Sequence, residues 1–168
     1  MPVSSNSIRP ESEPEKLDRI DYALIALLQK NARLSNKELA ARVGLAPSSC
    51  LERVRKLVTS GTITGFHADL DPATVGITLQ AMISVRLRRH SHAMVNAFRQ
   101  HVLTIPEVIA VYHVAGATDF LVHVGVRDAE HLRTLTMTTF TTRREVDHIE
   151  TSLVFEHQWK GIAVGEVV

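Results

Sequence analysis

The sequence has little of what builds a disulfide framework, a membrane span or a secretion signal. Its one cysteine among 168 residues, Cys50, excludes an internal disulfide and a zinc site made of several thiolates. No apolar run reaches the roughly 18 residues that a membrane helix needs. Residues 1–15 contain no apolar segment of the kind found in a secretory signal. These absences predict a cytoplasmic protein with no membrane partner.

Patterns that mark common catalytic sites are also absent. There is no phosphate-binding loop, no Gly-x-Ser-x-Gly and no His-Glu-x-x-His, so we expect neither an enzyme nor a cofactor. Apolar residues make up 45% of the chain, which excludes a mainly disordered or fibrous protein. Residues 16–76 carry nine Lys and Arg against six Asp and Glu, although the whole chain has a net charge of only +1. This local excess weakly favours a polyanionic partner.

The composition along the chain predicts two domains. Residues 1–15 hold three prolines and four serines with almost no apolar side chains, which is typical of a flexible tail. A C-terminal tail is expected at the other end. The predicted segments are the flexible tail over 1–15, a helical domain over 16–61, a linker strand over 62–76, a mixed domain over 77–160 and the C-terminal tail over 161–168.

Three helices are predicted in the first domain. The second begins at the capping box Ser35-Asn36-Lys37-Glu38 and ends at Gly44. The third begins at Pro47, which suits a first helical turn, and ends at Gly61. We interpret Cys50, inside this helix, as a small buried residue rather than a reactive thiol. The apolar face of the first helix is predicted at Leu17, Ile20, Leu24, Leu27 and Leu28. That of the third helix is predicted at Leu51, Val54, Leu57 and Val58.

The rest of the chain predicts strands with two further helices. Residues 62–70 are interpreted as one strand or a short hairpin, and Ser91 and Asp128 as helix caps. Four more strands are expected over 77–89, 108–115, 120–126 and 149–155. The order βαββαβ is the ferredoxin-like arrangement, so the fold class is α+β: a (winged) helix-turn-helix domain followed by a ferredoxin-like sandwich. Both helices then cover one face of the sheet, and the uncovered face favours an oligomer.

The second and third helices form a candidate helix-turn-helix. Ala40 and Gly44 are four residues apart, so the small side chain allows a close crossing and the glycine a tight turn. The third helix then presents a polar face to the major groove, where serines suit bases or phosphates and basic side chains suit phosphates. The candidate DNA-binding residues are Ser35, Asn36, Pro47, Ser48, Ser49, Glu52, Arg53, Arg55 and Lys56. The alternative is a plain three-helix bundle with a solvated basic face.

Several segments share a recognisable pattern. They read LDRID at 17–21, LLQKNAR at 27–33, SNKELAARVGL at 35–45, PSSCLERVRKL at 47–57, GTITGF at 61–66 and VAGATD at 114–119. Together they resemble the Lrp/AsnC family of prokaryotic transcription regulators, most specifically in the helix-turn-helix block. The resemblance implies binding to double-stranded DNA, a C-terminal domain that forms homodimers and often octamers, and a small-molecule effector that is usually an amino acid. It also implies that the strand near 62–70 pairs with its counterpart in a partner subunit.

With this resemblance, the turn from Gly116 to Asp119 is the candidate effector site. A tight turn offers backbone N–H groups to a carboxylate, and Asp119 could receive an ammonium group. The helix over 134–142 is rich in threonine where the family usually has leucine, and 143–146 lacks the family's Pro-Gly, so the effector type stays open. The candidate effector-binding residues are Val114, Ala115, Gly116, Thr118, Asp119, Thr138 and Thr139. The alternatives are an ordinary hairpin turn and a solvated threonine face.

Two other functions stay open. Eight of the nine histidines lie between residues 90 and 157, and a metal- or pH-responsive regulator would use them. His113 and His123 could approach one another across a hairpin, but no His-x-x-x-His spacing is present. A small enzyme, or a ligand-binding regulator of an enzyme, could also use the βαββαβ domain. Surface or half-buried histidines are the favoured interpretation, and no metal site is predicted.

Overall fold

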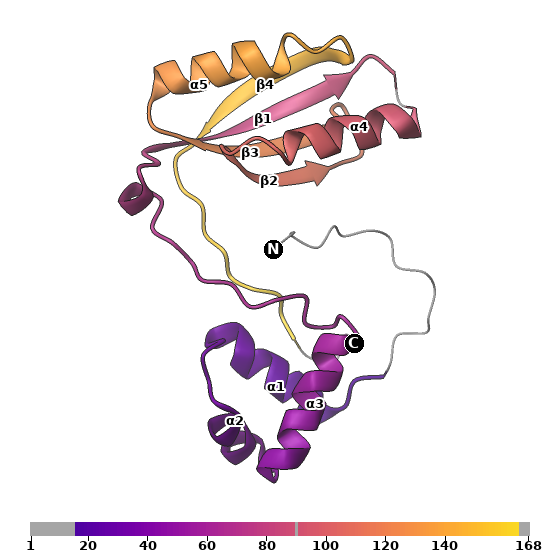
Figure 1. The fold of residues 1–168 in the computed structure, drawn as a ribbon, viewed down its shortest axis with the longest axis vertical. Coiled ribbons are helices and arrows are strands. Elements are labelled where there is room, and N and C mark those ends of the chain that lie inside the picture. Colours follow the sequence, from indigo (N-terminus) through magenta and orange to yellow (C-terminus); the bar gives the residue numbers. More distant parts are fainter. Residues whose placement is uncertain (1–15, 90, 165–168) are drawn as a thin grey trace. The chain divides into compact units, whose positions relative to one another are not determined.

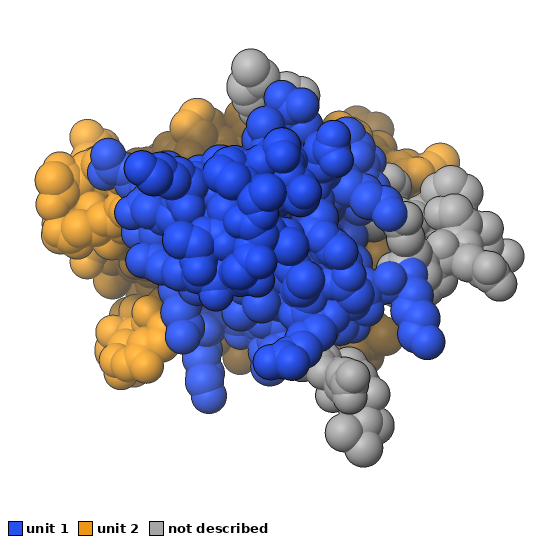
Figure 2. All heavy atoms as spheres, turned by 90° about the horizontal axis from the view of Figure 1, so that it is seen from below, with its two compact units in different colours: residues 1–68, 159–168 blue, residues 69–158 orange. Residues whose placement is uncertain are grey.

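The computed structural model describes residues 16–89 and 91–164. The chain divides into two compact units, residues 1–68 with 159–168 and residues 69–158 (Figure 2). Each unit has a hydrophobic core of its own. The predicted tail over 1–15 lies outside the described residues. No helix of the described part is long and apolar enough to cross a membrane.

Within its described residues, the first unit consists of three helices (Figure 1). They are α1 (Arg19–Lys30), α2 (Asn36–Val43) and α3 (Pro47–Thr59). Their shared core consists of Leu24, Leu28, Leu39, Ala40, Cys50 and Leu57. The predicted face of α1 and the buried Cys50 are confirmed. The predicted apolar face of α3 is partly wrong, because Leu51 is 37% and Val58 42% exposed. The predicted Val54 and Leu57 do face the core, and Cys50 joins them in place of Leu51 and Val58.

The segment after α3 is not the predicted strand or hairpin. Residues 64–70 have no regular secondary structure, so no wing is formed within the described residues of one chain. Ile63 is tied to α3, since its backbone N–H donates to the Leu57 carbonyl at 2.9 Å. A short 3-10 turn, η1 (Ala73–Val75), follows. A strand needs a neighbouring strand to satisfy its backbone, and the alternating pattern of residues 62–70 alone supplies none.

The second unit has the predicted βαββαβ order and confirms the α+β fold class. Its elements are β1 (Leu79–Leu87), α4 (His92–Val102), β2 (Val108–His113), β3 (Phe120–Val126), α5 (Ala129–Leu135) with its π-helical continuation η2 (Thr136–Phe140), and β4 (Val146–Val154). The strands form one antiparallel sheet in the order β2-β3-β1-β4. The predicted caps are confirmed, since Ser91 accepts a hydrogen bond from Met94 and Asp128 one from His131.

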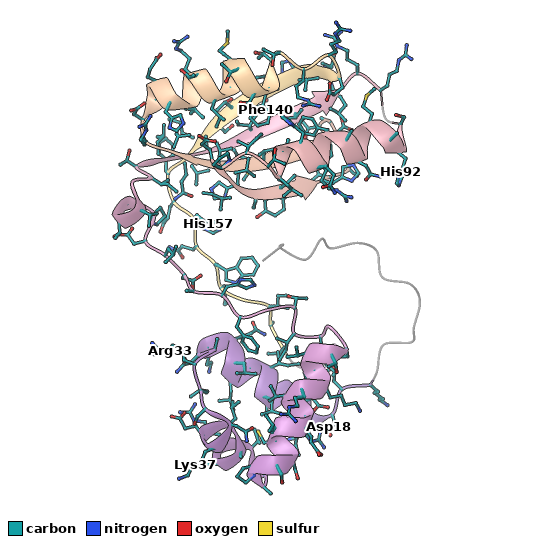
Figure 3. The ribbon with its side chains drawn as sticks, in the orientation of Figure 1. Asp18, Arg33, Lys37, His92, Phe140 and His157 are labelled. Carbon is teal, nitrogen blue, oxygen red and sulfur yellow. The ribbon has the colours of Figure 1, made fainter. Side chains whose placement is uncertain are left out.

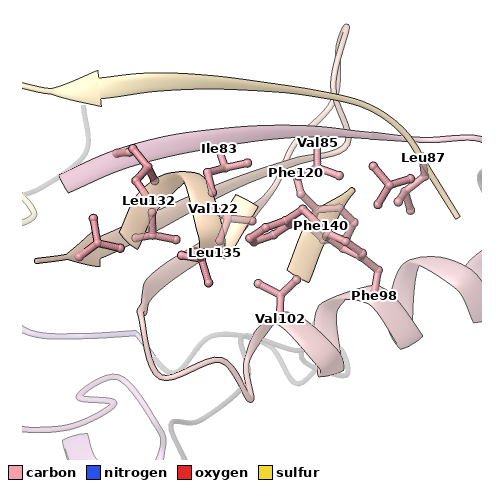
Figure 4. Close-up of a cluster of buried hydrophobic side chains, with 14 residues drawn as sticks. Ile83, Val85, Leu87, Phe98, Val102, Phe120, Val122, Leu132, Leu135 and Phe140 are labelled. Atoms are coloured by element: carbon pink, nitrogen blue, oxygen red, sulfur yellow. The ribbon is translucent and has the colours of Figure 1, made fainter. Parts of the chain in front are cut away.

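Both helices pack on one face of this sheet (Figure 4). Alternate residues of β1 and β3, such as Ile83, Val85 and Val122, meet Phe98 of α4 and Phe140 of η2, and all five side chains are fully buried. The intervening residues of the two strands lie on the opposite face, which no helix of the unit covers. We call this the open sheet face and define it by Met82, Ser84, Leu121 and His123.

Candidate nucleic-acid interface and ligand site

The geometry of the turn between α2 and α3 follows from local sequence signals. Ser35 and Glu38 form the predicted capping box, with the Ser35 backbone N–H donating to Glu38 Oε2 at 2.7 Å. The Ser35 hydroxyl and backbone N–H lower the pKa of the Glu38 carboxyl. Gly44 takes the left-handed conformation at φ 69°, and Ala40 is 1% exposed where the helices pack. The chain therefore leaves α2 in a tight turn and enters α3 at a fixed angle.

The start of α3 is tied to the start of α2. Pro47 occupies the first turn, and the Asn36 side-chain amide donates to the Pro47 carbonyl at 2.6 Å. Ser35 and Asn36, both candidate DNA contacts, are therefore engaged within the protein: Ser35 caps α2 and Asn36 joins the two helices. Their interactions position α3.

The remaining polar side chains of α3 lie on its solvent side. Pro47, Ser48, Ser49, Glu52, Arg55 and Lys56 are all exposed, while Cys50 and Leu57 point into the core. The helix thus separates a buried stripe from a polar face that carries two cations, one anion and two hydroxyls. A face of this composition suits the major groove, where Arg and Glu bond to base edges and basic groups to phosphates.

Arg53 lies apart from this polar face. Its Nη1 is 2.6 Å from Asp18 Oδ2 and 2.9 Å from Asp21 Oδ1. Asp18, which Figure 3 labels, lies at the start of α1. The Asp21 backbone N–H and the Arg53 guanidinium hold the pKa of Asp18 below its ordinary value, and the two carboxylates raise the pKa of Arg53. Asp18 is also the N-cap of α1, in a second capping box that we did not predict. Arg53 therefore joins α3 to the capped end of α1.

The predicted effector turn is held by backbone hydrogen bonds. Gly116 has φ 138°, and a Cβ built there would meet no atom within 4 Å. Asp119 Oδ2 accepts a hydrogen bond from the Leu87 backbone N–H at 2.7 Å, and its own N–H donates to the Val85 carbonyl at 2.9 Å. The carboxylate thus anchors the turn to the end of β1. The bond that the Asp119 carboxylate accepts from Leu87 is neither a contact with an ammonium group nor a bond within the turn itself.

Thr138 and Thr139 lie elsewhere in the second unit. They line a cavity of about 370 Å³ together with His101, Glu107 and His131, and none of residues 114–119 lines it. Within one chain, the structure therefore divides the candidate effector residues between a turn and a cavity. Sequence reasoning did not select His101, Glu107 and His131, because no motif joins residues spaced this widely along the chain.

The described histidines do not gather into a metal site. No group of three or more His, Cys, Asp or Glu residues within the described ranges could hold a metal ion. The possible approach of His113 to His123 across the hairpin does not occur, because the strand register pairs His113 with Phe120 and His123 with Ala110. His123 instead bonds to Gln80 at 2.8 Å and lies 5.6 Å from the His157 ring. Burial, and then the neighbouring His157, lower the pKa of His123.

The two units define a class of protein: a helix-turn-helix DNA-binding domain joined to a ferredoxin-like domain. Residues 17–58 match the AsnC-type helix-turn-helix domain, and residues 80–161 match the Lrp/AsnC ligand binding domain. The chain belongs to the Lrp/AsnC family of transcriptional regulators, which are not enzymes.

Curated relatives match this chain over most of their length. The chain is 43% identical over 155 residues to the HTH-type transcriptional regulator AldR of Mycobacterium tuberculosis, covering 92% of this chain and 84% of that protein. It is 36% identical over 140 residues to the leucine-responsive regulatory protein of Escherichia coli, covering 83% and 85%. Both relatives support a DNA-binding regulator with a ligand-binding domain.

Solved structures agree with this assignment. A transcriptional regulator of Neisseria meningitidis, solved as its L-methionine complex, superposes with a TM-score of 0.83 at 29% identity over 91% of this chain and all of that one. The crystal structure of AldR from M. tuberculosis gives a TM-score of 0.70 at 39% identity over 88% of this chain and 99% of that one.

Proposed function

We propose that this chain binds duplex DNA as a homodimer or larger assembly and that a bound amino acid changes its DNA affinity. The observation that carries the proposal is the exposed polar face of α3, which the capped and glycine-terminated α2 holds outward. Arg55 and Lys56 are suited to phosphates or guanine, Glu52 to a cytosine amino group, and Ser48 and Ser49 to either bases or phosphates. Arg53 is not among these contacts. Such a regulator would act in the cytoplasm, beside the chromosome.

The open sheet face supports the homodimer. A four-stranded sheet with both helices on one side leaves apolar side chains such as Met82 and Leu121 on the other side, and a second copy would bury them. A dimer presents two copies of α3. We therefore expect an operator with two half-sites, separated by about 34–36 Å or a multiple of it. Dimers of this kind could assemble further into octamers.

The turn from Gly116 to Asp119 is our proposed effector site. The carboxylate of an amino acid would meet backbone N–H groups of the turn, and Asp119, fixed by the Leu87 N–H, would receive the ammonium group. The match to a ligand-binding domain and the L-methionine complex of the Neisseria regulator support an amino acid as the effector. Between subunits, ligand binding would alter the spacing of the two α3 helices.

The test is a selection of bound fragments from the genomic DNA of the host, performed with the full chain and repeated with pooled amino acids. We expect enrichment of fragments that share two half-sites, and a change in the enriched set or its yield when the pool is present. A failure to enrich any fragment at low salt would contradict DNA binding. An enriched set that the pool leaves unchanged would contradict the amino-acid effector.

A further inference from the structure

The cavity beside α5 is not explained by the effector turn. It is bounded by the end of α4, the segment leading into β2, and the α5–η2 helix, all within the second unit. Its volume of about 370 Å³ falls within the roughly 300–1,000 Å³ typical of small-molecule sites. Its apolar side is formed by Ile105, Pro106 and Leu135. Its polar side carries a carboxylate, two imidazoles and several hydroxyls.

Glu107 and His131 form a fixed pair at this cavity. His131 Nε2 is 3.1 Å from Glu107 Oε1, and His131 Nδ1 accepts a hydrogen bond from the Arg127 backbone N–H at 3.4 Å. A neutral ring protonated at Nε2 satisfies both contacts. The two side chains keep 25% and 22% of their surface exposed. Glu107 Oε2 makes no hydrogen bond to any described residue, so the carboxylate retains a charged acceptor for a ligand.

Hydrogen-bond donors line the same cavity. The Thr134 hydroxyl and the His101 ring make no hydrogen bond to a described residue, and Thr139 has only a 3.4 Å contact with Thr138. Burial and then Arg143 lower the pKa of His101, which favours the neutral ring. A neutral imidazole offers one N–H donor. Hydroxyl and imidazole N–H donors are suited to a carboxylate.

Three threonines in and directly after η2 have a structural role. Thr138, Thr141 and Thr142 donate their hydroxyls to the carbonyls four residues earlier, at 2.8, 2.6 and 2.8 Å. These bonds supply partners to carbonyls in and around the widened π-helical turn. Thr134 and Thr139 do not share this role. Short π-helical segments occur frequently at functional sites, and this one borders the cavity.

We propose that this cavity is a second small-molecule site and that it takes a free amino acid. The ammonium group would bind Glu107, and the carboxylate would bind the Thr134 and Thr139 hydroxyls and the His101 ring. The side chain would lie against Ile105 and Leu135. The site shares with the proposed function only the premise that this domain binds a ligand, and it is separate from the turn at Gly116.

The test is calorimetric titration of the full chain with individual L-amino acids, each beside its N-acetylated and 2-oxo analogues. A binding amino acid should show two classes of site per chain, and neither analogue should occupy the cavity because both lack the ammonium group. Glu107→Gln keeps the shape and the bond from His131 but removes the charge. It should weaken one class roughly 10- to 150-fold, the range for a charge-assisted hydrogen bond. Glu130→Gln, on α5 outside the cavity, should change neither class.

Thr134→Val provides a second variant that keeps the shape of its side chain. It should weaken the same class as Glu107→Gln, whereas Asp119→Asn should weaken the other. One class of site per chain, sensitive to Asp119→Asn but not to Glu107→Gln or Thr134→Val, would contradict binding in the cavity and support binding at the turn. A single class of site per chain that requires Glu107 but not Asp119 would support the cavity and contradict the turn. No binding of any amino acid would overturn both assignments.

Discussion

At the residue scale, three basic side chains of α3 that look alike in the sequence have different surroundings. Arg53, Arg55 and Lys56 were all predicted to contact DNA, yet Arg53 is paired with Asp18 and Asp21 of α1. Periodicity places a residue on a face of its own helix. It does not reveal which neighbouring helix supplies a carboxylate. The acidic residues of the LDRID segment, about 32 to 35 positions earlier, are that source.

Replacing Arg53 should therefore weaken the helical unit itself. Arg53→Met keeps most of the aliphatic stem but removes the ion pairs that join α3 to α1, so the first unit should unfold at a lower temperature. Arg55→Met, on the exposed face of the same helix, is the matched control and should leave the midpoint unchanged. Thermal melts of the full chain followed by circular dichroism measure both. Equal midpoints for wild type and Arg53→Met would show that the pair contributes nothing.

His123 should make stability depend on pH. Burial lowers its pKa in the folded chain, so the unfolded chain binds this proton more readily. Its contribution is therefore fully present above the unfolded value of about 6.5, and it is lost as pH falls towards the lower folded value. The free energy of unfolding should fall more between pH 7.5 and pH 5.5 in wild type than in His123→Gln, measured by urea denaturation. The exposed His148→Gln should behave as wild type, and parallel curves for wild type and His123→Gln would count against a buried neutral His123.

At the element scale, the sequence predicted what adjacent residues determine. The Ser35–Glu38 box, the Gly44 terminus and the Ser91 and Asp128 caps are local, and each is present in the structure. Elements that depend on distant partners were predicted less well. Residues 62–70 have no strand partner among the described residues, and an approach of His113 to His123 would require a register that β2 and β3 do not adopt.

The candidate effector residues were also predicted only as far as local sequence allows. Thr138 and Thr139 were selected because threonine is unusual in that helix, and they do line a cavity. Of their partners there, Glu107 lies in the turn before β2 and His131 on α5, 24 residues apart. Only the sheet topology brings those elements together. The π-helical turn was also missed, because its amphipathic pattern reads as an ordinary helix.

Gly44 gives a direct test of the turn between α2 and α3. At φ 69° an alanine would be strained although nothing crowds its Cβ, so Gly44→Ala should cost about 1–2 kcal/mol of stability through the backbone alone. Asparagine tolerates the left-handed conformation better, so Gly44→Asn should cost less. Denaturant unfolding of the full chain compares the stability of the wild type, Gly44→Ala and Gly44→Asn. An alanine variant as stable as wild type would mean that this turn relaxes to another conformation.

At the scale of the whole molecule, we expect chains to associate through the open sheet face. We expect the full chain to sediment as a dimer or larger. Met82→Glu places a charge on that face and should weaken association by at least about tenfold, because burying an unpaired charge is costly. Met137→Glu, on the helix side where Met137 is 54% exposed, is the control and should leave the assembly intact. Sedimentation velocity over a concentration series checks this, and a monomeric wild type at micromolar concentration would contradict the dimer.

If α3 binds duplex DNA through phosphate contacts, the affinity must depend on salt, and this dependence is the measurement to make. Fluorescence anisotropy with a selected duplex, titrated with the full chain at several salt concentrations, gives the slope of log affinity against log salt. Arg55→Ala should weaken binding and flatten the slope by about one unit if Arg55 contacts one phosphate per duplex, and more if both half-sites lose a contact. Arg133→Ala, an equal change of charge in the second unit, should leave both affinity and slope unchanged. No binding at low salt, or identical curves for wild type and Arg55→Ala, would contradict the account.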